Sequence, residues 1–411
     1  MNVKRNGLIL GFVFISASVW AQTDRIQIGG SARVRGEIKK NADFTDTADD
    51  YMDFIGSRFR LDMKVQATEK VNIFLQPQFS KTWGESEFVP TDTTTNTAIN
   101  TSGATNDTPI DIHQAYFGYQ VNEPLSFTFG RKELSYGDEL LVGGVGWSNV
   151  GRSFDLILGS YKHSYGTVDA FYSLVFDRNT TTAGASDREF SGIYSAHKIS
   201  ETVEHADAYV LNSRDPSTNP PSSTTAYGLK LKSPVGPFDY RTELTFENVK
   251  AAKSTDERQY DVEVGYTFDA AKKFRVALEY FSASGNFDQL FPTGHKWLGY
   301  ADLFSRRNIQ GYHARVAGQV FKGLVASIDY HRFERQDTDR SAYKFNGTST
   351  YGATGDSPHI ADEYDLVLTY ALDENLTVEG GAARALPGDY LKENGGSDIA
   401  TFYYLQVATS F

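Results

Sequence analysis

The sequence predicts an all-β fold, a transmembrane antiparallel β-barrel of about 18 strands, with about 16 as the alternative count. Three observations predict it. Apolar and polar residues alternate with a period of two in segment after segment, as in strands with one apolar face. The connections between these segments alternate between long and short. The chain also ends on residues 402–411 (FYYLQVATSF), an alternating run about long enough for a tilted strand to cross a hydrocarbon layer.

The N-terminus carries the features of a secretion signal. Lys4 and Arg5 precede the apolar run 7–20 (GLILGFVFISASVW), and a small-residue cleavage site ends at Ala21. An apolar run this short does not span a bilayer as a helix. We therefore expect residues 1–21 to be a removed signal peptide and residues 22–411 to form a single barrel domain.

The composition excludes several classes of protein. The 411 residues contain no cysteine, which excludes disulfide frameworks and thiolate metal sites. Because cleavage would remove Lys4 and Arg5 from the 40 basic residues, 38 would remain against 52 acidic ones. Such an acidic exported protein is a poor candidate for nucleic-acid binding. The acidic run Asp46, Asp49 and Asp50 could bind calcium, but a solvated loop is the favoured interpretation, so no metal site is predicted.

The expected strands begin directly after the signal. In residues 25–39, Ile28 and Val34 share one parity, and Arg33 and Arg35 share the other. The same alternation predicts further strands near residues 58–65, 71–83, 112–121, 125–131, 153–162, 167–177, 190–198, 205–212, 224–232, 238–249, 259–268, 274–284, 308–320, 324–332, 363–371, 376–383 and 402–411.

The connections between these strands predict the orientation of the barrel. Long connections follow the odd-numbered strands, at residues 40–50, 84–110, 132–152, 178–189, 213–223, 250–258, 285–307, 333–362 and 384–401. Short ones follow even-numbered strands, at residues 67–70, 122–124, 163–166, 233–237, 269–273, 322–323 and 373–375. Outer-membrane barrels have long extracellular loops and short periplasmic turns. We therefore expect both termini in the periplasm and the barrel in the outer membrane of a Gram-negative bacterium.

The polar parity of the strands should face the lumen, and it carries a cluster of arginines. Arg33 and Arg35 on the first strand would lie beside Arg58 and Arg60 on the second, and Arg315 faces inward farther along the chain. Neighbouring cations repel one another unless an anionic group, from the protein or from a solute, lies among them. The alternative interpretation is that these charges only pair within the wall of a wide barrel.

Two connections have unusual sequences. Residues 130–155 (GRKELSYGDELLVGGVGWSNVGRSFD) are rich in glycine, so their backbone can turn sharply, and they lie where porins fold a constricting loop inward. Residues 287–307 (FDQLFPTGHKWLGYADLFSRR) are apolar for a loop, and we expect them to pack on the barrel rim or inside the pore. In the first segment the candidate solute-binding residues are the cations Arg131, Lys132 and Arg152 and the sugar-stacking rings Tyr136 and Trp147.

The blocks GRKELSYGDELL…WSNVGRSFD and FDQLFPTGHKWLGYADLF, with the strand pattern between them, resemble the alginate export family of outer-membrane barrels. The resemblance covers nearly the whole mature chain. It implies a monomeric 18-stranded barrel whose arginine-rich constriction passes an anionic polyuronate outward. It also implies constriction or loop-fixing roles for Arg131, Asp138, Arg152 and Asp155, and, through strand order alone, for Arg33 and for Arg58 or Arg60.

The leading functional hypothesis is therefore a passive outer-membrane channel for an anionic solute, a polyuronate or similar saccharide. Positive side chains at a narrow point lower the electrostatic barrier to carboxylates. A general or differently specific porin is one alternative, and a surface adhesin or receptor that works through its long loops is another. The chain has eight histidines but no G-x-S-x-G or H-E-x-x-H motif, so we expect neither enzymatic activity nor a cofactor.

The hypothesis also names partners. A barrel of this kind contacts the lipid bilayer and the lipopolysaccharide of the outer membrane. Residues 402–411 would present the closing strand to the barrel assembly machinery. We expect no nucleic-acid partner and a monomeric state.

Overall fold

The alternating segments form a closed barrel of 18 antiparallel strands in a computed structural model. The structure describes residues 25–47, 51–84, 108–176, 188–200, 203–251, 253–268, 274–353 and 355–411. Its strands are β1 (Ile26–Lys40), β2 (Tyr51–Gln66), β3 (Val71–Thr82), β4 (Thr108–Gln120), β5 (Leu125–Lys132), β6 (Phe154–His163), β7 (Gly166–Phe176), β8 (Arg188–His197), β9 (His205–Asp215), β10 (Ser222–Val235), β11 (Phe238–Lys250), β12 (Thr255–Thr267), β13 (Arg275–Ala283), β14 (Ile309–Phe321), β15 (Leu324–Glu334), β16 (His359–Asp373), β17 (Leu376–Pro387) and β18 (Ala400–Ser410). The predicted strand count is confirmed.

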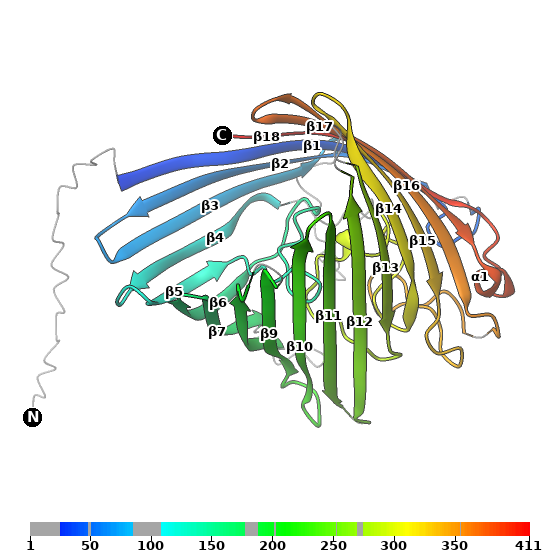
Figure 1. Ribbon diagram of the computed structural model, residues 1–411, viewed down its shortest axis with the longest axis horizontal. Coiled ribbons are helices and arrows are strands. Elements are labelled where there is room, and N and C mark those ends of the chain that lie inside the picture. The colour runs from blue at the N-terminus through cyan, green and yellow to red at the C-terminus, as the bar shows by residue number, and fades with distance from the viewer. Residues whose placement is uncertain are drawn as a thin grey trace, which may run out of the picture.

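The barrel closes where the two ends of the chain meet. Each strand pairs with its neighbour in sequence, and β1 also pairs with β18, with Val34 opposite Val407. Figure 1 shows the blue β1 beside the red β18. Past the last ladder pair, Phe411 and Gly30 exchange two backbone hydrogen bonds of 3.1 Å each. Closure removes the open sheet edges that a membrane would not tolerate.

The two faces of the wall differ as the alternation predicts. Large apolar side chains cover the outside; Ile28, Leu278 and Leu405 are 66%, 65% and 60% exposed. On the other parity of β1, Arg33 and Arg35 are buried against the contents of the lumen. Among the described residues, no helix is both long and apolar enough to cross a membrane. The short helices η2 (Gly294–Lys296) and α1 (Asp389–Glu393) belong to loops.

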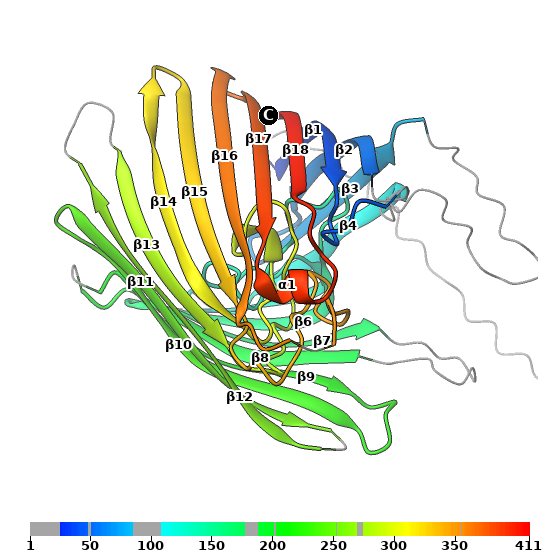
Figure 2. The same cartoon turned by 90° about the vertical axis from the view of Figure 1, so that its right-hand side faces the viewer.

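The predicted rhythm of long and short connections holds for most of the barrel and is wrong around β12. The connection between β11 and β12, predicted as a long one at residues 250–258, spans residues 251–254, whereas the predicted short one between β12 and β13 spans residues 268–274. The turn between β14 and β15 spans residues 322–323, whereas residues 284–308 join β13 to β14. Figure 2 shows α1 among the loops at the end of the barrel opposite the C-terminus. The predicted signal peptide, residues 1–21, lies outside the described residues and stays a prediction.

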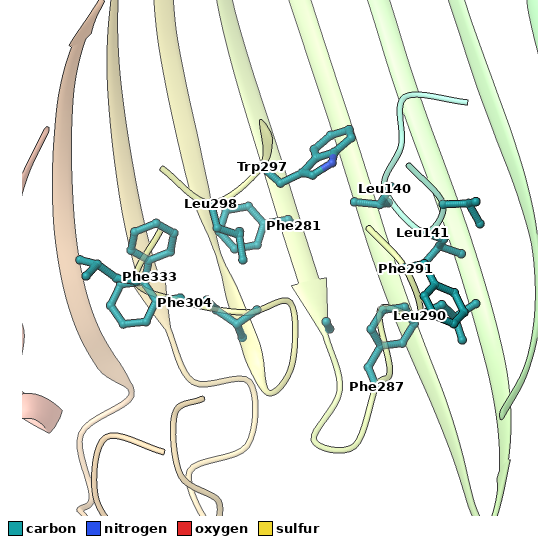
Figure 3. Packing of buried hydrophobic residues seen from close by; sticks show 14 of the residues in the cluster. Leu140, Leu141, Phe281, Phe287, Leu290, Phe291, Trp297, Leu298, Phe304 and Phe333 are labelled. Carbon is teal, nitrogen blue, oxygen red and sulfur yellow. The ribbon is translucent and has the colours of Figure 1, made fainter. Parts of the chain in front are cut away.

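A hydrophobic core fills part of the lumen at the long-loop end. Figure 3 shows rings of the inward-folded loop at 284–308 near Leu140 and Leu141 of the loop at 133–153, and near Phe281 of β13 and Phe333 of β15. Its labelled members are Leu140, Leu141, Phe281, Phe287, Leu290, Phe291, Trp297, Leu298, Phe304 and Phe333, all buried. The apolar loop predicted to pack on the rim or inside the pore therefore packs inside.

Candidate channel constriction

The loop at residues 133–153 crosses the interior of the barrel and is held on one side by the arginines of β1. The guanidinium of Arg33 donates to the carbonyl oxygens of Gly146, Trp147 and Ser148 at 3.0, 2.7 and 3.1 Å, and to Oδ1 of Asn149 at 2.9 Å. Arg35 donates to the same Trp147 carbonyl at 2.8 Å. Hydrogen bonds from the two arginines of β1 thus fix the backbone of this part of the loop.

The arginines of β2 complete this anchor. Arg58 donates to the carbonyls of Gly146 and Ser148 at 3.0 and 2.9 Å, and Arg60 to the carbonyl of Val150 at 3.1 Å. Carbonyl oxygens satisfy N–H donors but carry no net charge. Among the described residues, the only ion pair that these four arginines make is Arg35 with Glu37. The wall therefore keeps an excess of positive charge.

Ion pairs hold the other end of the loop. The carboxylate of Asp138 lies 3.0 Å from Nζ of Lys230 and 3.1 Å from Nζ of Lys232, both on β10. Burial raises the pKa of Asp138, but the two ammonium groups outweigh it, and the net effect is a pKa below the ordinary value of 3.8. Asp138 thus stays ionised and fixes the loop across the lumen.

The loop at residues 284–308 packs against the first one. Phe291 bridges Val142 in a parallel arrangement, with backbone hydrogen bonds of 2.9 Å to Leu141 and Gly143. Arg152 joins the two loops, since it donates to the carbonyls of Gly143 and Pro292 at 3.4 and 2.9 Å. Burial and the nearby Arg188 lower the pKa of Arg152 to about 10. Arg152 and Asp138 are thus loop-fixing residues in this structure.

The two predicted sugar-stacking rings are covered by protein groups. The guanidinium of Arg35 lies 3.8 Å from the centre of the Trp147 ring, and the His295 ring stacks on Trp147 at 3.8 Å. Two groups at that distance must occupy opposite faces. Tyr136 stacks on Tyr194 at 4.4 Å and donates to Asp169. The expectation that a sugar stacks on Trp147 is therefore wrong for this conformation, and the main stacking partner of Tyr136 is another tyrosine.

Arg131 and Asp155 were expected to line the pore, and the structure corrects this. They face each other across β5 and β6 and form a bidentate ion pair of 2.8 and 2.9 Å. They share the parity of Phe129 and Ile157, and Ile157 is 54% exposed on the lipid-facing wall. The alternation of each strand therefore places this pair on the outside of the barrel.

Two further candidates do face inward. Lys132 lies 5.1 Å from the ring of Tyr116, on the opposite parity from Arg131. Arg315 on β14 approaches Asp329 at 3.5 Å and keeps 39% of its side chain exposed. In the acidic run considered for calcium, Asp46 pairs with Lys40 at 3.3 Å, and Asp49 and Asp50 lie outside the described residues.

A cavity of about 740 Å³ opens at the long-loop end, and most of its charged residues were not predicted. Its walls come from the ends of β8 and β10 to β12 and from the loops at 284–308 and 335–358. The cationic lining residues are Arg188, Lys253, Arg306, Arg307 and Arg340, and the acidic one is Asp288. These cations lie in or beside loops, where no strand parity indicates which way a side chain points.

Comparison with known proteins adds the following. The profile of the alginate export family matches residues 24–404. No curated protein matches the sequence. Among solved structures, the fold is similar to Pseudomonas aeruginosa OccK9 (OpdG), at 12% identity over 94% of this chain and 98% of that one, with a TM-score of 0.66. The outer membrane protein OpdK of the same organism is 12% identical over 94% of this chain and 99% of that one, with a TM-score of 0.63. OccK2 (OpdF) of P. aeruginosa, solved in complex with glucuronate, is 11% identical over 94% of this chain and 98% of that one, with a TM-score of 0.63.

Proposed function

The chain belongs to the alginate export family and is an outer-membrane β-barrel channel of a Gram-negative bacterium, and from that premise we propose that it passes an anionic saccharide, a polyuronate, by diffusion. The solute would cross the lumen past the paired loops at 133–153 and 284–308. No step of such passage makes or breaks a covalent bond.

The excess of cations around the extracellular cavity carries the proposal. Of the cavity's arginines, Arg188 has a carboxylate partner in Asp288 at 3.6 Å and Arg340 has one in Asp337 at 3.2 Å. Among the described residues, the hydrogen-bond partners of Arg307 are all uncharged: the carbonyls of Gly285 and Gly347 and the amide oxygen of Asn286, at 3.4, 3.1 and 3.4 Å. A carboxylate that enters the cavity would gain in Arg307 a charged partner that makes no ion pair with an acid of the described residues.

The rest of the cavity fits a hydroxylated ring. Amide and hydroxyl groups of Gln289, Asn346 and Thr348 line it, together with the rings of Phe287 and Phe345. Several weak sites of this kind allow a solute to enter and leave again. One structure of similar fold was solved with glucuronate, which belongs to the chemical class proposed here.

The arginines of β1 and β2 would act on the same solute through their field. Their hydrogen bonds are used on the loop, so they do not offer a free guanidinium at the narrow point. Their positive charge persists because the loop carbonyls do not cancel it, and charge in a low-dielectric wall acts over several ångströms. The proposal therefore assigns them a dual role, which is to fix the loop and to favour anions beside it.

The proposal also covers the partners. We propose that the barrel works as a monomer in contact with lipopolysaccharide, and that β18 is the strand that the assembly machinery recognises. The outward Arg131 and Asp155 would then lie at the level of the lipid head groups, since they are at the long-loop ends of β5 and β6.

Block of single channels in a planar bilayer tests the proposal. We expect uronate oligosaccharides to interrupt the current and neutral oligosaccharides of the same length to do so far more weakly. The double variant R307Q/R340Q should weaken the uronate block by about tenfold, because it removes two charged hydrogen-bond donors. R131Q is the matched control, since it removes an outward arginine. Equal block by neutral sugars, or unchanged block in the double variant, would contradict the proposal.

A further inference from the structure

Two cations lie close together on the lipid-facing side of the barrel, near its long-loop end. Across the strands, Arg384 of β17 is opposite Thr401 of β18, and Thr401 is also opposite Lys40 of β1. Through these pairings all three share the outward parity of Leu405, which is exposed on the outer wall. Neighbouring strands are about 4.8 Å apart, so the Cα atoms of Arg384 and Lys40 are about 10 Å apart. Two long side chains at this spacing can reach one anionic group from both sides.

The position of these cations along the barrel corresponds to the outer head-group region. Thr401 precedes Phe411 by ten residues, and Phe411 is an exposed ring just past the other end of β18. A strand tilted by about 40° rises about 25 Å over this length, which is the height of the apolar band of such barrels. If Phe411 marks the periplasmic edge of this band, the two cations lie at its extracellular edge.

Tyrosine rings flank both cations. Tyr364 of β16 is opposite Arg384, and Tyr51 of β2 is opposite Lys40. Both rings are exposed on the outer wall, and tyrosine is enriched where the wall of a barrel meets the membrane–water interface. The rings therefore support the same placement of the two cations.

An apolar groove of about 640 Å³ lies on the periplasmic side of Lys40, toward the middle of the outer wall. It forms because Gly36 of β1 has no side chain between its two cross-strand partners, Leu405 of β18 and Ile55 of β2. Figure 1 shows these three strands side by side, with β17 next to them. Ile38 precedes Lys40 by two residues on the same face, so the groove leads up to the cations. The outward apolar residues that line it are Gly36, Ile38, Ile55, Trp83, Tyr403 and Leu405.

Arg384 is free to bind a ligand. In the described part of the chain, no acid forms an ion pair with its guanidinium. Lys40 pairs with Asp46 at 3.3 Å, but the two side chains are 49% and 62% exposed, and such exposed pairs are weak. An anion that approaches from the membrane can therefore take both cations.

Two acidic residues also line the groove. The side chain of Glu37 points to the lumen, where it pairs with Arg35. Asp53 is opposite Ile38 and points outward. An exposed carboxylate is compatible with a position close to the head groups but is costly in the middle of a bilayer. Asp53 thus also indicates that the upper end of the groove lies at the interface.

We propose that a phosphate group of lipopolysaccharide binds Arg384 and Lys40, and that one of its acyl chains lies in the groove over Gly36. A guanidinium binds phosphate through paired hydrogen bonds, and an ammonium group binds it as a point charge. Lipopolysaccharide forms the outer leaflet of the outer membrane, so its phosphates and acyl chains meet the barrel at this height. The site specifies the contact with lipopolysaccharide proposed above and rests on that part of the proposed function. Bound there, the lipid would cover the seam where β1 closes on β18.

Native mass spectrometry of the purified full-length barrel in detergent tests the proposal, with diphosphoryl lipid A as the added lipid. The apparent dissociation constant of the first bound lipid is compared between the wild type and each variant. K40Q/R384Q removes both cations. Its matched control is R131Q, since Arg131 is an outward arginine near the same end of the barrel whose guanidinium is already held by Asp155.

G36L tests the groove without changing a charge. A Cβ at Gly36 would lie 3.8 Å from Cγ1 of Ile55 and 4.0 Å from the carbonyl oxygen of Phe54, so a larger side chain fits there and fills the groove. G380L is the control, because Gly380 is the other cross-strand partner of Leu405 and lies outside the lining of the groove.

We expect K40Q/R384Q to weaken lipid A binding by about tenfold, and G36L to weaken it by about fourfold for each CH₂ group displaced from the groove. R131Q and G380L should bind lipid A as the wild type does. The faster gel migration of the unheated folded barrel shows that each variant has folded.

Unchanged lipid A binding in K40Q/R384Q or in G36L, or an equal loss in R131Q, would overturn the proposal. A dimer that G36L abolishes would also overturn it and assign the groove to a second copy of the chain. The readout is bound lipid, so its failure is distinct from a failure of uronate to block the channel.

Discussion

Arginines face the lumen on two parts of the inner wall, at β1 and β2 and at β11 to β13. The groups that accept hydrogen bonds from these arginines differ between the two parts. Arg33 and Arg58 bind backbone carbonyls of the inward loop. Arg241 on β11 and Arg306 from the second loop bind the carboxylate of Asp261 on β12. Carbonyls fix a guanidinium in place without cancelling its charge, whereas carboxylates do both. One wall is thus left positive, whereas in the other the charges of Arg241 and Arg306 are cancelled and carboxylates outnumber arginines.

The largest effect is expected where a carboxylate would lose its cation. Arg306 is fully buried, 2.7 Å from Oδ2 of Asp261, which is also fully buried. R306M should destabilise the barrel by about 3–5 kcal/mol, because among the described residues it leaves this buried carboxylate with Arg241 as its one cationic partner. Denaturant unfolding followed by tryptophan fluorescence measures this. A loss below about 1 kcal/mol would show that the two walls do not differ in this way.

At β1 and β2, where arginines bind backbone carbonyls, the position of the loop should depend on the hydrogen-bonding geometry of the guanidinium more than on its charge. R33M removes four hydrogen bonds to residues 146–149 and should cost about 2–3 kcal/mol, since hydrogen bonds from a charged donor are stronger than neutral ones. The three carbonyls each keep one donor, from Arg35 or Arg58. The loop should loosen and the channel conductance should rise. R33K keeps the charge but not the fork of donors, so it should retain the ion selectivity of the wild type while its conductance rises as in R33M. Equal conductance in all three proteins would contradict a loop-fixing role for Arg33.

The ion pairs of Asp138 with Lys230 and Lys232, at the other end of the loop, should make the stability of the loop's attachment depend on pH by about 1 kcal/mol. Because the folded pKa of Asp138 is below 3.8, its stabilising contribution is present above that pH and is lost as the pH falls through the folded pKa. The loop should therefore detach from Lys230 and Lys232 in acid, and the conductance should rise below about pH 3.8. D138N should show the raised conductance already at neutral pH. A D138N channel that matches the wild type across the pH range would remove this anchor from the account.

The smallest effect is expected on the outside of the barrel. Arg131 and Asp155 are 42% and 55% exposed at the side chain, and exposed pairs contribute about 0–1 kcal/mol. R131Q should therefore change the unfolding free energy by less than about 1 kcal/mol and leave the conductance unchanged. A clear loss of anion selectivity in R131Q would return Arg131 to the pore.

The fold was predictable because a membrane imposes its pattern on every strand. Ile28 faces lipid and Arg33 faces the lumen for one reason, which is that odd and even side chains of a strand point to opposite sides. The same rule predicted the inward direction of Arg58 and Arg60. The same rule also predicts the observed outward direction of Arg131, which shares its parity with Phe127 and Phe129. The family resemblance had instead suggested that Arg131 lines the pore.

The parts that sequence reasoning missed depend on contacts between distant segments. The ring of Trp147 is covered by Arg35 and His295, more than a hundred residues away on either side. No local pattern indicates that pairing. Arg307 and Arg340 share a cavity because two loops fold toward each other, and loops have no period from which the direction of a side chain follows.

The reversal potential of the purified wild-type channel in a planar bilayer, under a gradient of potassium chloride, tests the central claim most directly. The account assigns an excess of positive charge to the wall at β1 and β2 and to the extracellular cavity. It therefore predicts that chloride carries more current than potassium, by a margin that shrinks at high salt because charges are then screened. A channel that prefers potassium at low salt would contradict the account, whatever solute the barrel carries.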